Sequence, residues 1–465
     1  MRRLLMVCYD FPPSAVGIWR TLKFCRYMRE NGWMPAILTV RGIRGPLWDE
    51  GPLRELPPGT EIRRTGTADA YRLAYIADKY RRRFRPDDIE APADKGAAAK
   101  ATHPLGRRVM DLLRAWVLVP DDRIGWYPYA VGEGKRWLAD GGFDAVYSTS
   151  YPHSAHLIGR RLAEHANLPF IADYRDIWIE NYQFYKPPTG FHDSLHRRME
   201  RNVVRRAFRV VSATEPISED FRRRYPEENP EKFATITNGF DSRDYRGKEP
   251  KPDRQHFTIS YVGLMYGQTS PEVFLQGIRL LLDREPRWKK SLRLRFVGSL
   301  IEPYEEMIDA FRLRKYTSVE SYVPHEWALQ AMMDADALLL VVAPVEGSHI
   351  MMTQKVFEYV AARRPILALV PEGAVRDFLD LIGEGVVVNP RSAEGVANAV
   401  DKMLLTWHVH GRPELPDNRL IRNFERRRLA RKLCEMLNQG VDAYGGRPMG
   451  EVPRFSEDVA PELAE

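Results

Sequence analysis

Short runs of consecutive apolar residues alternate along the chain with segments whose apolar residues recur at helical spacing. Strands that are apolar at successive positions are typical of sheets covered by helices on both faces. Alternation of such strands with helices predicts an α/β protein with parallel, doubly wound sheets. The runs predicted as strands are Leu4–Tyr9, Ala36–Val40, Ala145–Ser148, Phe170–Asp173, Val210–Ala213, Thr258–Val262, Leu292–Val297, Ala337–Ala343, Ile366–Val370 and Val386–Val388.

The predicted strands fall into two groups, separated by the charged, proline-containing segment Asp241–His256. This composition is typical of a linker between domains. Parallel sheets bind ligands outside the carboxyl ends of their strands, so two Rossmann-like domains that face each other are expected to bind ligands in the cleft between them. The expected divisions are an N-terminal domain (1–245) with a mobile insertion (81–102), a C-terminal domain (256–415), a crossover helix (416–440) and a disordered tail (441–465).

The charge of the chain is moderately basic. Lysine and arginine outnumber aspartate and glutamate by 70 to 63, which favours anionic partners. No stacking-aromatic module or recognition motif accompanies the basic residues, so a nucleic-acid partner is not expected. The arginine-rich segment Leu195–Arg209 has two interpretations: a solvated helix face, or a peripheral contact with an anionic membrane.

Cysteine usage and hydropathy predict a cytoplasmic protein. Cys8, Cys25 and Cys434 are too widely spaced for a disulfide framework, which favours a reducing compartment. The longest apolar run, Ala337–Val345, is far shorter than the about 20 residues that a membrane-spanning helix needs. The apolar start of the chain ends at Asp10 and is interpreted as a first strand rather than a signal peptide.

Polar residues follow two of the predicted strands of the first domain. Asp173, Arg175 and Asp176 come at the end of FIADYRDIW and are candidates for binding hydroxyl groups or for general-base work. Ser150 and His153 follow the preceding strand in STSYPHSAHLIG, and with Asp173 they are candidates for contact with a ligand. The alternative for His153 is that of a polar residue at the start of a helix.

Two further stretches place polar groups where a strand leads into a helix. Gly17, in FPPSAVGIWR, could bring backbone N–H groups toward a phosphate or sugar, or could mark only a tight turn. TQKVFEYVAARRPILALVP places Lys355 and Glu358 at the start of a helix. Lys355 is predicted to bind phosphate and Glu358 a ribose diol; the alternative is an i,i+3 ion pair between them.

No metal site is predicted. Asp334 and Asp336 form an acidic pair, but they precede a strand and are expected at its amino end, away from the ligand. No cluster of cysteine and histidine has zinc-binding spacing. The predicted protein therefore uses no cofactor beyond a co-substrate.

The ordered set of motifs resembles the family 4 glycosyltransferases, which have the two-domain GT-B architecture. The similar stretches run from Leu5 to about Leu437 and include FPPSAVG, STSYPHSAHLIG, ADYRDIW, TITNGFD, ISYVGLMYG and QKVFEYVAARRPILAL. The last stretch is similar to a sub-branch with the pattern K-x-F-E-Y-x-A. The closest resemblance is to bacterial members that act in cell-surface polysaccharide assembly.

The resemblance implies that the protein moves a sugar from a nucleotide-sugar to a glycan or lipid-linked acceptor. Such transfer is retaining and needs no metal, and the final helix crosses back to the first domain. By position in the motifs, Glu358 would contact the ribose, and Gly17 and Gly263 would approach the diphosphate and sugar. Gln268 and Ile350 stand where the family has a basic and an acidic residue.

The mechanism that we expect is a transfer without a protein nucleophile. Lys355 would stabilise the leaving diphosphate, and Arg175 and Asp176 would act beside the acceptor. Two other functions stay open from the sequence: a non-catalytic subunit that binds a nucleotide-sugar or glycan, and a nucleotide-sugar epimerase of the same fold.

Overall fold

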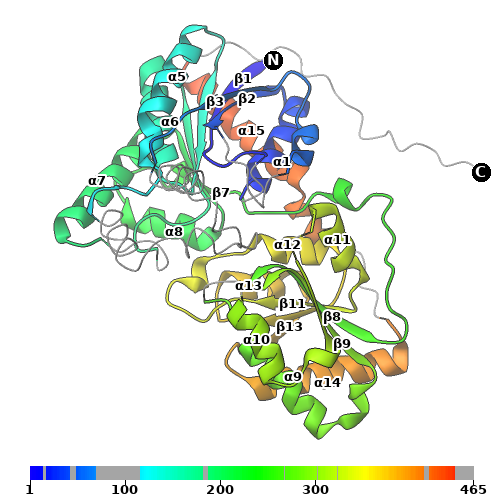
Figure 1. The fold of residues 1–465 in the computed structure, drawn as a ribbon. Helices are drawn as coiled ribbons and strands as arrows, with labels where there is room; N and C mark the ends of the chain where they lie inside the picture. Colours follow the sequence, from blue (N-terminus) through cyan, green and yellow to red (C-terminus); the bar gives the residue numbers. More distant parts are fainter. Residues whose placement is uncertain are drawn as a thin grey trace, which may run out of the picture. The chain divides into compact units, whose positions relative to one another are not determined.

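The computed structural model describes residues 1–13, 17–41, 49–69, 116–181, 187–265, 268–300, 302–321, 323–412 and 418–445. These residues form two compact units (Figure 1). Unit 1 is Met1–Ile236 together with the chain from Arg427 onward, and unit 2 is Thr237–Arg426. The predicted insertion at 81–102 and the tail beyond residue 445 lie outside the described residues.

Unit 1 contains a seven-stranded parallel sheet of order β3-β2-β1-β4-β5-β6-β7. Strand order reverses between β1 and β4, and the carboxyl ends of parallel strands at such a point form the usual ligand site of a doubly wound sheet. The strands are β1 (Arg2–Val7), β2 (Trp33–Val40), β3 (Glu61–Thr65), β4 (Ala145–Thr149), β5 (Phe170–Tyr174), β6 (Arg209–Ser212) and β7 (Phe233–Thr235).

Helices cover both faces of this sheet (Figure 1). The longest described helices that follow its strands are α1 (Trp19–Met28), α5 (Tyr127–Ala139), α6 (Ser154–Ala166), α7 (Gly190–Arg206) and α8 (Glu215–Arg224). α1 shares a hydrophobic core with β1 and β2, which includes Leu4, Phe24 and Ile37. α5 and α6 pack against each other, and α6 also contacts β1, β4 and β5.

The last helix, α15 (Arg426–Ala443), returns to unit 1, as predicted. Its residues Leu429, Leu433 and Leu437 are buried in the core formed with α1, β1 and β2. The residues before it form a separate 3-10 helix, η9 (Arg419–Phe424). The continuous helix expected from Asn418 is therefore interrupted at Glu425, where the chain passes from unit 2 to unit 1.

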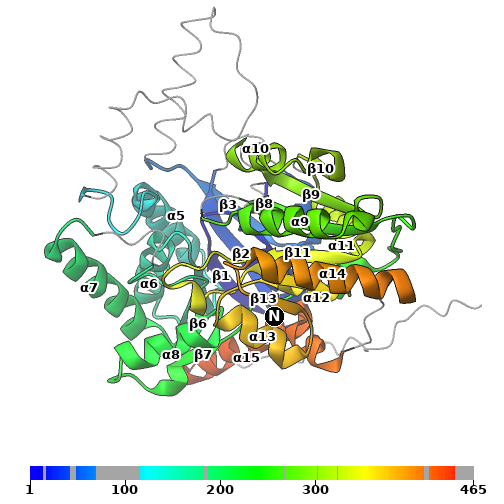
Figure 2. The ribbon, with the colours of Figure 1, turned by 90° about the horizontal axis from the view of Figure 1, so that it is seen from below.

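Unit 2 contains a six-stranded parallel sheet of order β10-β9-β8-β11-β12-β13 (Figure 2). Its strands are β8 (Phe257–Met265), β9 (Leu292–Leu300), β10 (Thr317–Glu320), β11 (Ala337–Val341), β12 (Ile366–Leu369) and β13 (Val386–Val388). One hydrophobic core joins the sheet to α9 (Glu272–Arg284), α10 (Glu302–Ala310) and α14 (Ala393–His410). The other joins it to α11 (His325–Asp334), α12 (Gln354–Ala361) and α13 (Ala374–Ile382).

The predicted fold class is confirmed: both units are Rossmann-like α/β structures with parallel sheets. All of the predicted strands are present with small shifts of their ends. β3, β7 and β10 were not predicted, and each lies at an edge of its sheet. In the described part of the chain, no helix has the length and apolar character needed to cross a membrane.

Candidate functional site

Lys355 extends along the carboxyl end of β8 in unit 2. α12 begins after Thr353, whose hydroxyl accepts a hydrogen bond from the Lys355 N–H at 3.4 Å. The Lys355 ammonium donates to the Tyr261 hydroxyl and, at 3.2 Å, to the Leu264 carbonyl oxygen. It also lies 4.4 Å from the centre of the Tyr261 ring, within the range of a cation–π interaction. A positive charge is thus fixed where parallel sheets bind ligands.

Two glycines make room for this lysine. Gly263 has φ of +124°, and a Cβ there would lie 2.4 Å from Lys355 Cε. Gly298, its neighbour in the register of β8 and β9, has φ of +123°, and a Cβ there would lie 2.5 Å from the Gly263 carbonyl oxygen. The structure therefore brings Gly263 and Lys355 together. Gly298 was not predicted, although the stretches VGL and VGS at the ends of the two strands hinted at it.

Glu358 pairs with His325 and Gln354 rather than with Lys355. Its Oε1 lies 3.5 Å from Nε2 of His325 and 3.4 Å from Nε2 of Gln354. Burial alone would raise the pKa of Glu358, but His325 and Gln354 outweigh burial and lower the pKa. Glu358 is accordingly an ionised acceptor one turn into α12, and its partners are His325 and Gln354 rather than Lys355, as the alternative of an i,i+3 ion pair would require.

The other positions singled out in unit 2 lie in loops at the same end of the sheet. Gln268 is exposed in the turn after β8, and Ile350 ends the 3-10 helix η8 (Ser348–Ile350) after β11. The next loop contacts η8 closely, since a Cβ at Gly373 would lie 2.2 Å from the His349 carbonyl oxygen. The donor-binding role of Gln268 stays a prediction.

In unit 1, Arg175 joins the loops that follow β1, β4 and β5. Its Nε donates to the carbonyl oxygen of Ser150, and its Nη1 donates to that of Gly17. Its Nη2 donates to the carbonyl oxygen of Tyr151 at 3.0 Å. The structure thereby brings together Gly17, Ser150 and Arg175, which are far apart in the sequence. Gly17 has φ of +65°, a conformation that favours glycine.

Two carboxyl groups lie near Arg175 at this end of the sheet. Asp176 and Asp10 are both half-buried, and neither forms a hydrogen bond or ion pair with another described residue. Burial raises the pKa of both carboxyl groups, and Arg175 opposes that rise. A carboxyl group with a raised pKa at a strand end is suited to accept a proton from a bound hydroxyl. Asp10 was not predicted, although an acid directly after the first strand was a usable signal.

Asp173 has a different environment. It is fully buried, and its two carboxylate oxygens accept hydrogen bonds from Nε and Nη2 of Arg20 at 2.8 and 2.7 Å. Tyr147 and Thr149 also donate to it, at 2.6 and 3.0 Å. Burial alone would raise its pKa, but Arg20 and these hydrogen bonds outweigh burial and lower the pKa. These partners of Asp173 all lie within unit 1, and its acceptor-binding role stays a prediction.

Comparison with known proteins identifies the segment that contains this group of residues. Residues 17–239, a little under half of the chain, match the family described as the glycosyl transferase 4-like domain. The sub-branch with the K-x-F-E-Y-x-A pattern stays a prediction. Among curated proteins, the chain has no significant sequence match.

Solved structures similar to this chain have the GT-B fold at low sequence identity. Anabaena Alr3699/HepE in complex with UDP and glucose is 11% identical with a TM-score of 0.62, over 94% of this chain and 100% of that one. Trehalose 6-phosphate synthase from Burkholderia multivorans is 13% identical (TM-score 0.57; 96% and 99%). Sucrose-phosphate synthase from Thermosynechococcus elongatus is 14% identical (TM-score 0.56; 96% and 95%). The likeness confirms the fold of both units.

Unit 1 also contains two buried histidines. His153 stacks on Trp178 with ring centres 4.9 Å apart, and its Nδ1 has no hydrogen-bond partner among the described residues. His156 Nδ1 lies 2.8 Å from Ser148 Oγ. Burial lowers the pKa of His153 well below its usual value and lowers that of His156 to about 3. Both side chains are therefore neutral, and the acceptor-binding role of His153 stays a prediction.

The burial of His156 predicts that unit 1 loses stability in acid. Between pH 6.5 and 3 the unfolded chain binds a proton that the folded His156 does not, so the free energy of unfolding falls as pH falls, by about 1.4 kcal/mol per unit. Urea unfolding of the wild type should give a loss of about 2 kcal/mol from this residue between pH 7 and pH 5. His156→Gln should reduce the pH dependence by that amount, and an unchanged dependence would contradict the assignment.

The acidic pair of unit 2 has structural partners. Asp336 accepts a hydrogen bond from the Thr258 N–H at 2.9 Å and lies 3.3 Å from Nε of Arg412. Asp334 accepts the Lys251 N–H at 2.6 Å. Both aspartates lie at the amino end of β11, as expected from the sequence. Asp336 bonds the start of β8, and Asp334 bonds the segment before β8.

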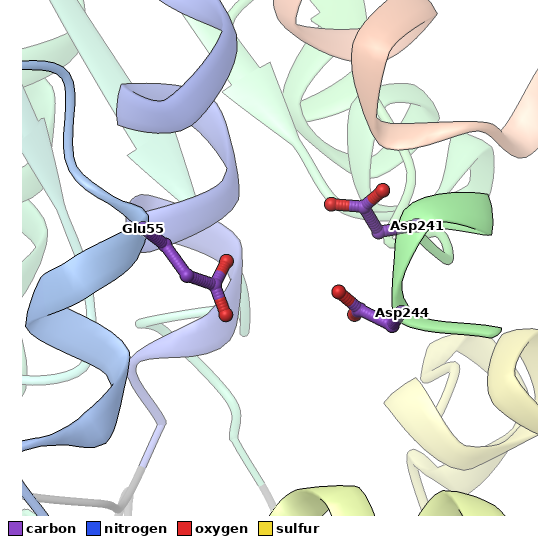
Figure 3. Close-up of side chains that lie close together, drawn as sticks. All are labelled: Glu55, Asp241 and Asp244. Atoms are coloured by element: carbon purple, nitrogen blue, oxygen red, sulfur yellow. The ribbon is translucent and has the colours of Figure 1, made fainter. Parts of the chain in front are cut away.

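Figure 3 shows three further carboxylates, Glu55 of unit 1 and Asp241 and Asp244 of unit 2. Asp241 accepts the Arg243 N–H at 3.1 Å and so caps η5 (Ser242–Tyr245), which also contains Asp244. Glu55, in unit 1, pairs with Lys23 at 2.7 Å. Because Glu55 and the two aspartates belong to different units, they define no ligand set.

Proposed function

We propose that the protein is a glycosyltransferase that moves a sugar from a nucleotide-sugar to a glycan or lipid-linked acceptor. The observation that carries this proposal is the placement of Lys355 along Gly263 at the carboxyl end of β8. It occurs in a chain whose other unit contains a glycosyl transferase 4-like domain. The similar fold of HepE, solved with UDP-glucose, supports a uridine nucleotide as the donor class.

In unit 2, different residues of the proposed donor site would bind the diphosphate and the ribose of the nucleotide-sugar. The Lys355 ammonium and the N-terminus of α12 would neutralise the diphosphate. Gly263 and Gly298 leave the backbone open to the phosphates and the sugar. Glu358, ionised and 15% exposed in its side chain, would accept hydrogen bonds from the ribose hydroxyls.

In unit 1, the proposed acceptor site is the loop cluster held by Arg175. Because its N–H groups donate to the carbonyl oxygens of Gly17, Ser150 and Tyr151, Arg175 would act as a positioning residue. Asp176 would bind the acceptor hydroxyl, and its raised pKa suits that role. We propose a retaining, metal-independent transfer in which the leaving diphosphate takes the proton of the attacking hydroxyl on the same face of the sugar.

The setting that we propose is polysaccharide synthesis at the inner face of a membrane. On α7, Arg198 and Arg201 are exposed. At the start of that helix, Phe191 is 72% exposed, and Trp116, whose ring contacts His192, is 52% exposed. Aromatic and basic side chains together suit an anionic lipid surface. Co-sedimentation with anionic but not with neutral vesicles tests this contact, and equal binding to both would contradict it.

A panel of nucleotide-sugars tests the proposed activity. UDP-, GDP-, ADP- and dTDP-sugars are compared by thermal shift, and we expect a UDP-sugar to raise the melting temperature most. Release of UDP is then measured with and without a mixture of lipid-linked and oligosaccharide acceptors. Acceptor-dependent release supports transfer. Binding without release under any condition indicates a binding subunit, and conversion of the donor to an epimer indicates an epimerase. The absence of binding to every donor would overturn the proposal.

A further inference from the structure

A polar hollow lies at the amino ends of β8, β9 and β10 in unit 2, at the opposite end of the sheet from Lys355. Its volume is about 400 Å³. Its basic lining residues are Lys251, Arg293, Arg295 and Lys315, and Ser260 also lines it. We call it the basic hollow.

The strand register explains why this part of the sheet is polar. Along β9, Leu292, Leu294 and Phe296 belong to the hydrophobic core on one face of the sheet, so Arg293 and Arg295 point to the other face. Ser260 of β8 and Ser318 of β10 both lie opposite Arg295 in the register. The hydroxyl groups of Ser260 and Ser318 therefore flank Arg295 on this face of the sheet.

The positive charge of the basic hollow is only partly neutralised. Arg295 pairs with Glu320 at 2.6 Å, and Arg293 Nη2 lies 2.8 Å from Nε2 of His256. Asp253 and Asp334 also line the hollow; Asp253 lies 2.5 Å from Nδ1 of His256, and Asp334 accepts a hydrogen bond from the Lys251 N–H. The side chains of Lys251 and Lys315 form no ion pair with any carboxylate in the part of the chain that the structure describes, so the four basic side chains exceed the carboxylates Asp253, Asp334 and Glu320 by one charge. Excess positive charge on one wall attracts an anion.

Ser260 supplies a second, independent indication of a ligand. The residue is fully buried, and its Oγ has no hydrogen-bond partner among the described residues. A buried hydroxyl without a hydrogen-bond partner is unfavourable. Because Ser260 lines the basic hollow, a ligand oxygen there would satisfy it.

We propose that the basic hollow binds a small molecule that carries a phosphate group. Arginine, lysine and serine side chains together provide the charged and neutral donors that phosphate oxygens accept. The volume, about 400 Å³, is in the range of small-molecule sites and exceeds what one phosphate group needs, which favours a phosphate monoester over inorganic phosphate. This site is separate from the proposed donor site and does not depend on it.

Calorimetric titration of the full chain with inorganic phosphate and with glycerol 3-phosphate tests the proposal. We expect both probes to bind, and the monoester to bind more tightly. Arg293→Gln/Lys315→Gln should weaken binding at least ten-fold while leaving the affinity for UDP unchanged. The matched control, Arg284→Gln/Lys290→Gln, makes the same charge change at exposed positions of unit 2 outside the hollow and should bind as the wild type does.

A second variant separates this site from the proposed donor site. Lys355→Met should retain binding of glycerol 3-phosphate, because Lys355 lies at the other end of the strands. The proposal is overturned if the wild type binds neither probe at about 10 mM, a concentration that corresponds to an affinity of only about 3 kcal/mol. It is also overturned if the Arg293→Gln/Lys315→Gln variant binds normally, or if Lys355→Met abolishes binding.

Discussion

Replacing Lys355 with methionine is expected to lower kcat about 100-fold or more, with little change in the stability of the protein. The ammonium is held at the carboxyl end of β8 by Tyr261 and Leu264 before any ligand binds, so its orientation requires no reorganisation during transfer. Removing one preorganised group that stabilises developing negative charge typically costs a factor of about 10²–10³ in kcat. Methionine retains most of the apolar length of lysine beside Gly263.

The measurement is UDP release at saturating donor and acceptor, with urea unfolding of the same preparations. Lys402→Met, at an exposed position of α14, is the matched control and should behave as the wild type does. Gly263→Ala should also reduce kcat, because its methyl group would lie where Lys355 Cε passes. If Lys355→Met retained full kcat, Lys355 would have no part in the reaction, even if the protein proved to be a transferase.

The strands that could be predicted are those buried on both faces, because burial selects consecutive apolar residues. β1 is apolar from its third residue onward, and β11 is apolar throughout. β3 and β10 have the sequences EIRRT and TSVE and could not be recognised, because an edge strand has a neighbour on one side only and keeps polar positions in contact with solvent. β7 has the sequence FAT, in which only Phe233 is buried, whereas the equally short edge strand β13 could be predicted because it consists of three valines.

In the candidate site, too, some residues could be predicted from the sequence and others could not. Lys355 could be proposed from its position at the start of a helix and Gly263 from the family resemblance, and the structure brings them together. Asp173 and Arg175 lie two residues apart in the sequence, but one faces the interior and the other donates hydrogen bonds to loop carbonyl oxygens. Sequence alone could not distinguish them, since the buried partner of Asp173, Arg20, is on a helix far away in the chain.

That buried pair gives the largest expected effect on stability. Asp173→Asn should reduce the free energy of unfolding by about 3–5 kcal/mol, because it leaves the Arg20 guanidinium, 3% exposed, without the carboxylate. The hydrogen bonds between Arg20 and Asp173 also connect α1 to the end of β5. Arg20 Nη2 donates a further hydrogen bond to the carbonyl oxygen of Ile236 at 2.8 Å. The loss should appear in urea unfolding at pH 7.

A double variant shows whether the loss comes from the unmatched charge. Arg20→Met/Asp173→Leu removes both charges and should recover part of the lost stability, since apolar replacements of a buried ion pair are often neutral. If Asp173→Asn instead unfolds like the wild type but raises KM for the acceptor, Asp173 binds the acceptor directly. The two outcomes differ because a carboxylate that already receives hydrogen bonds from Arg20, Tyr147 and Thr149 has little capacity left for a substrate hydroxyl.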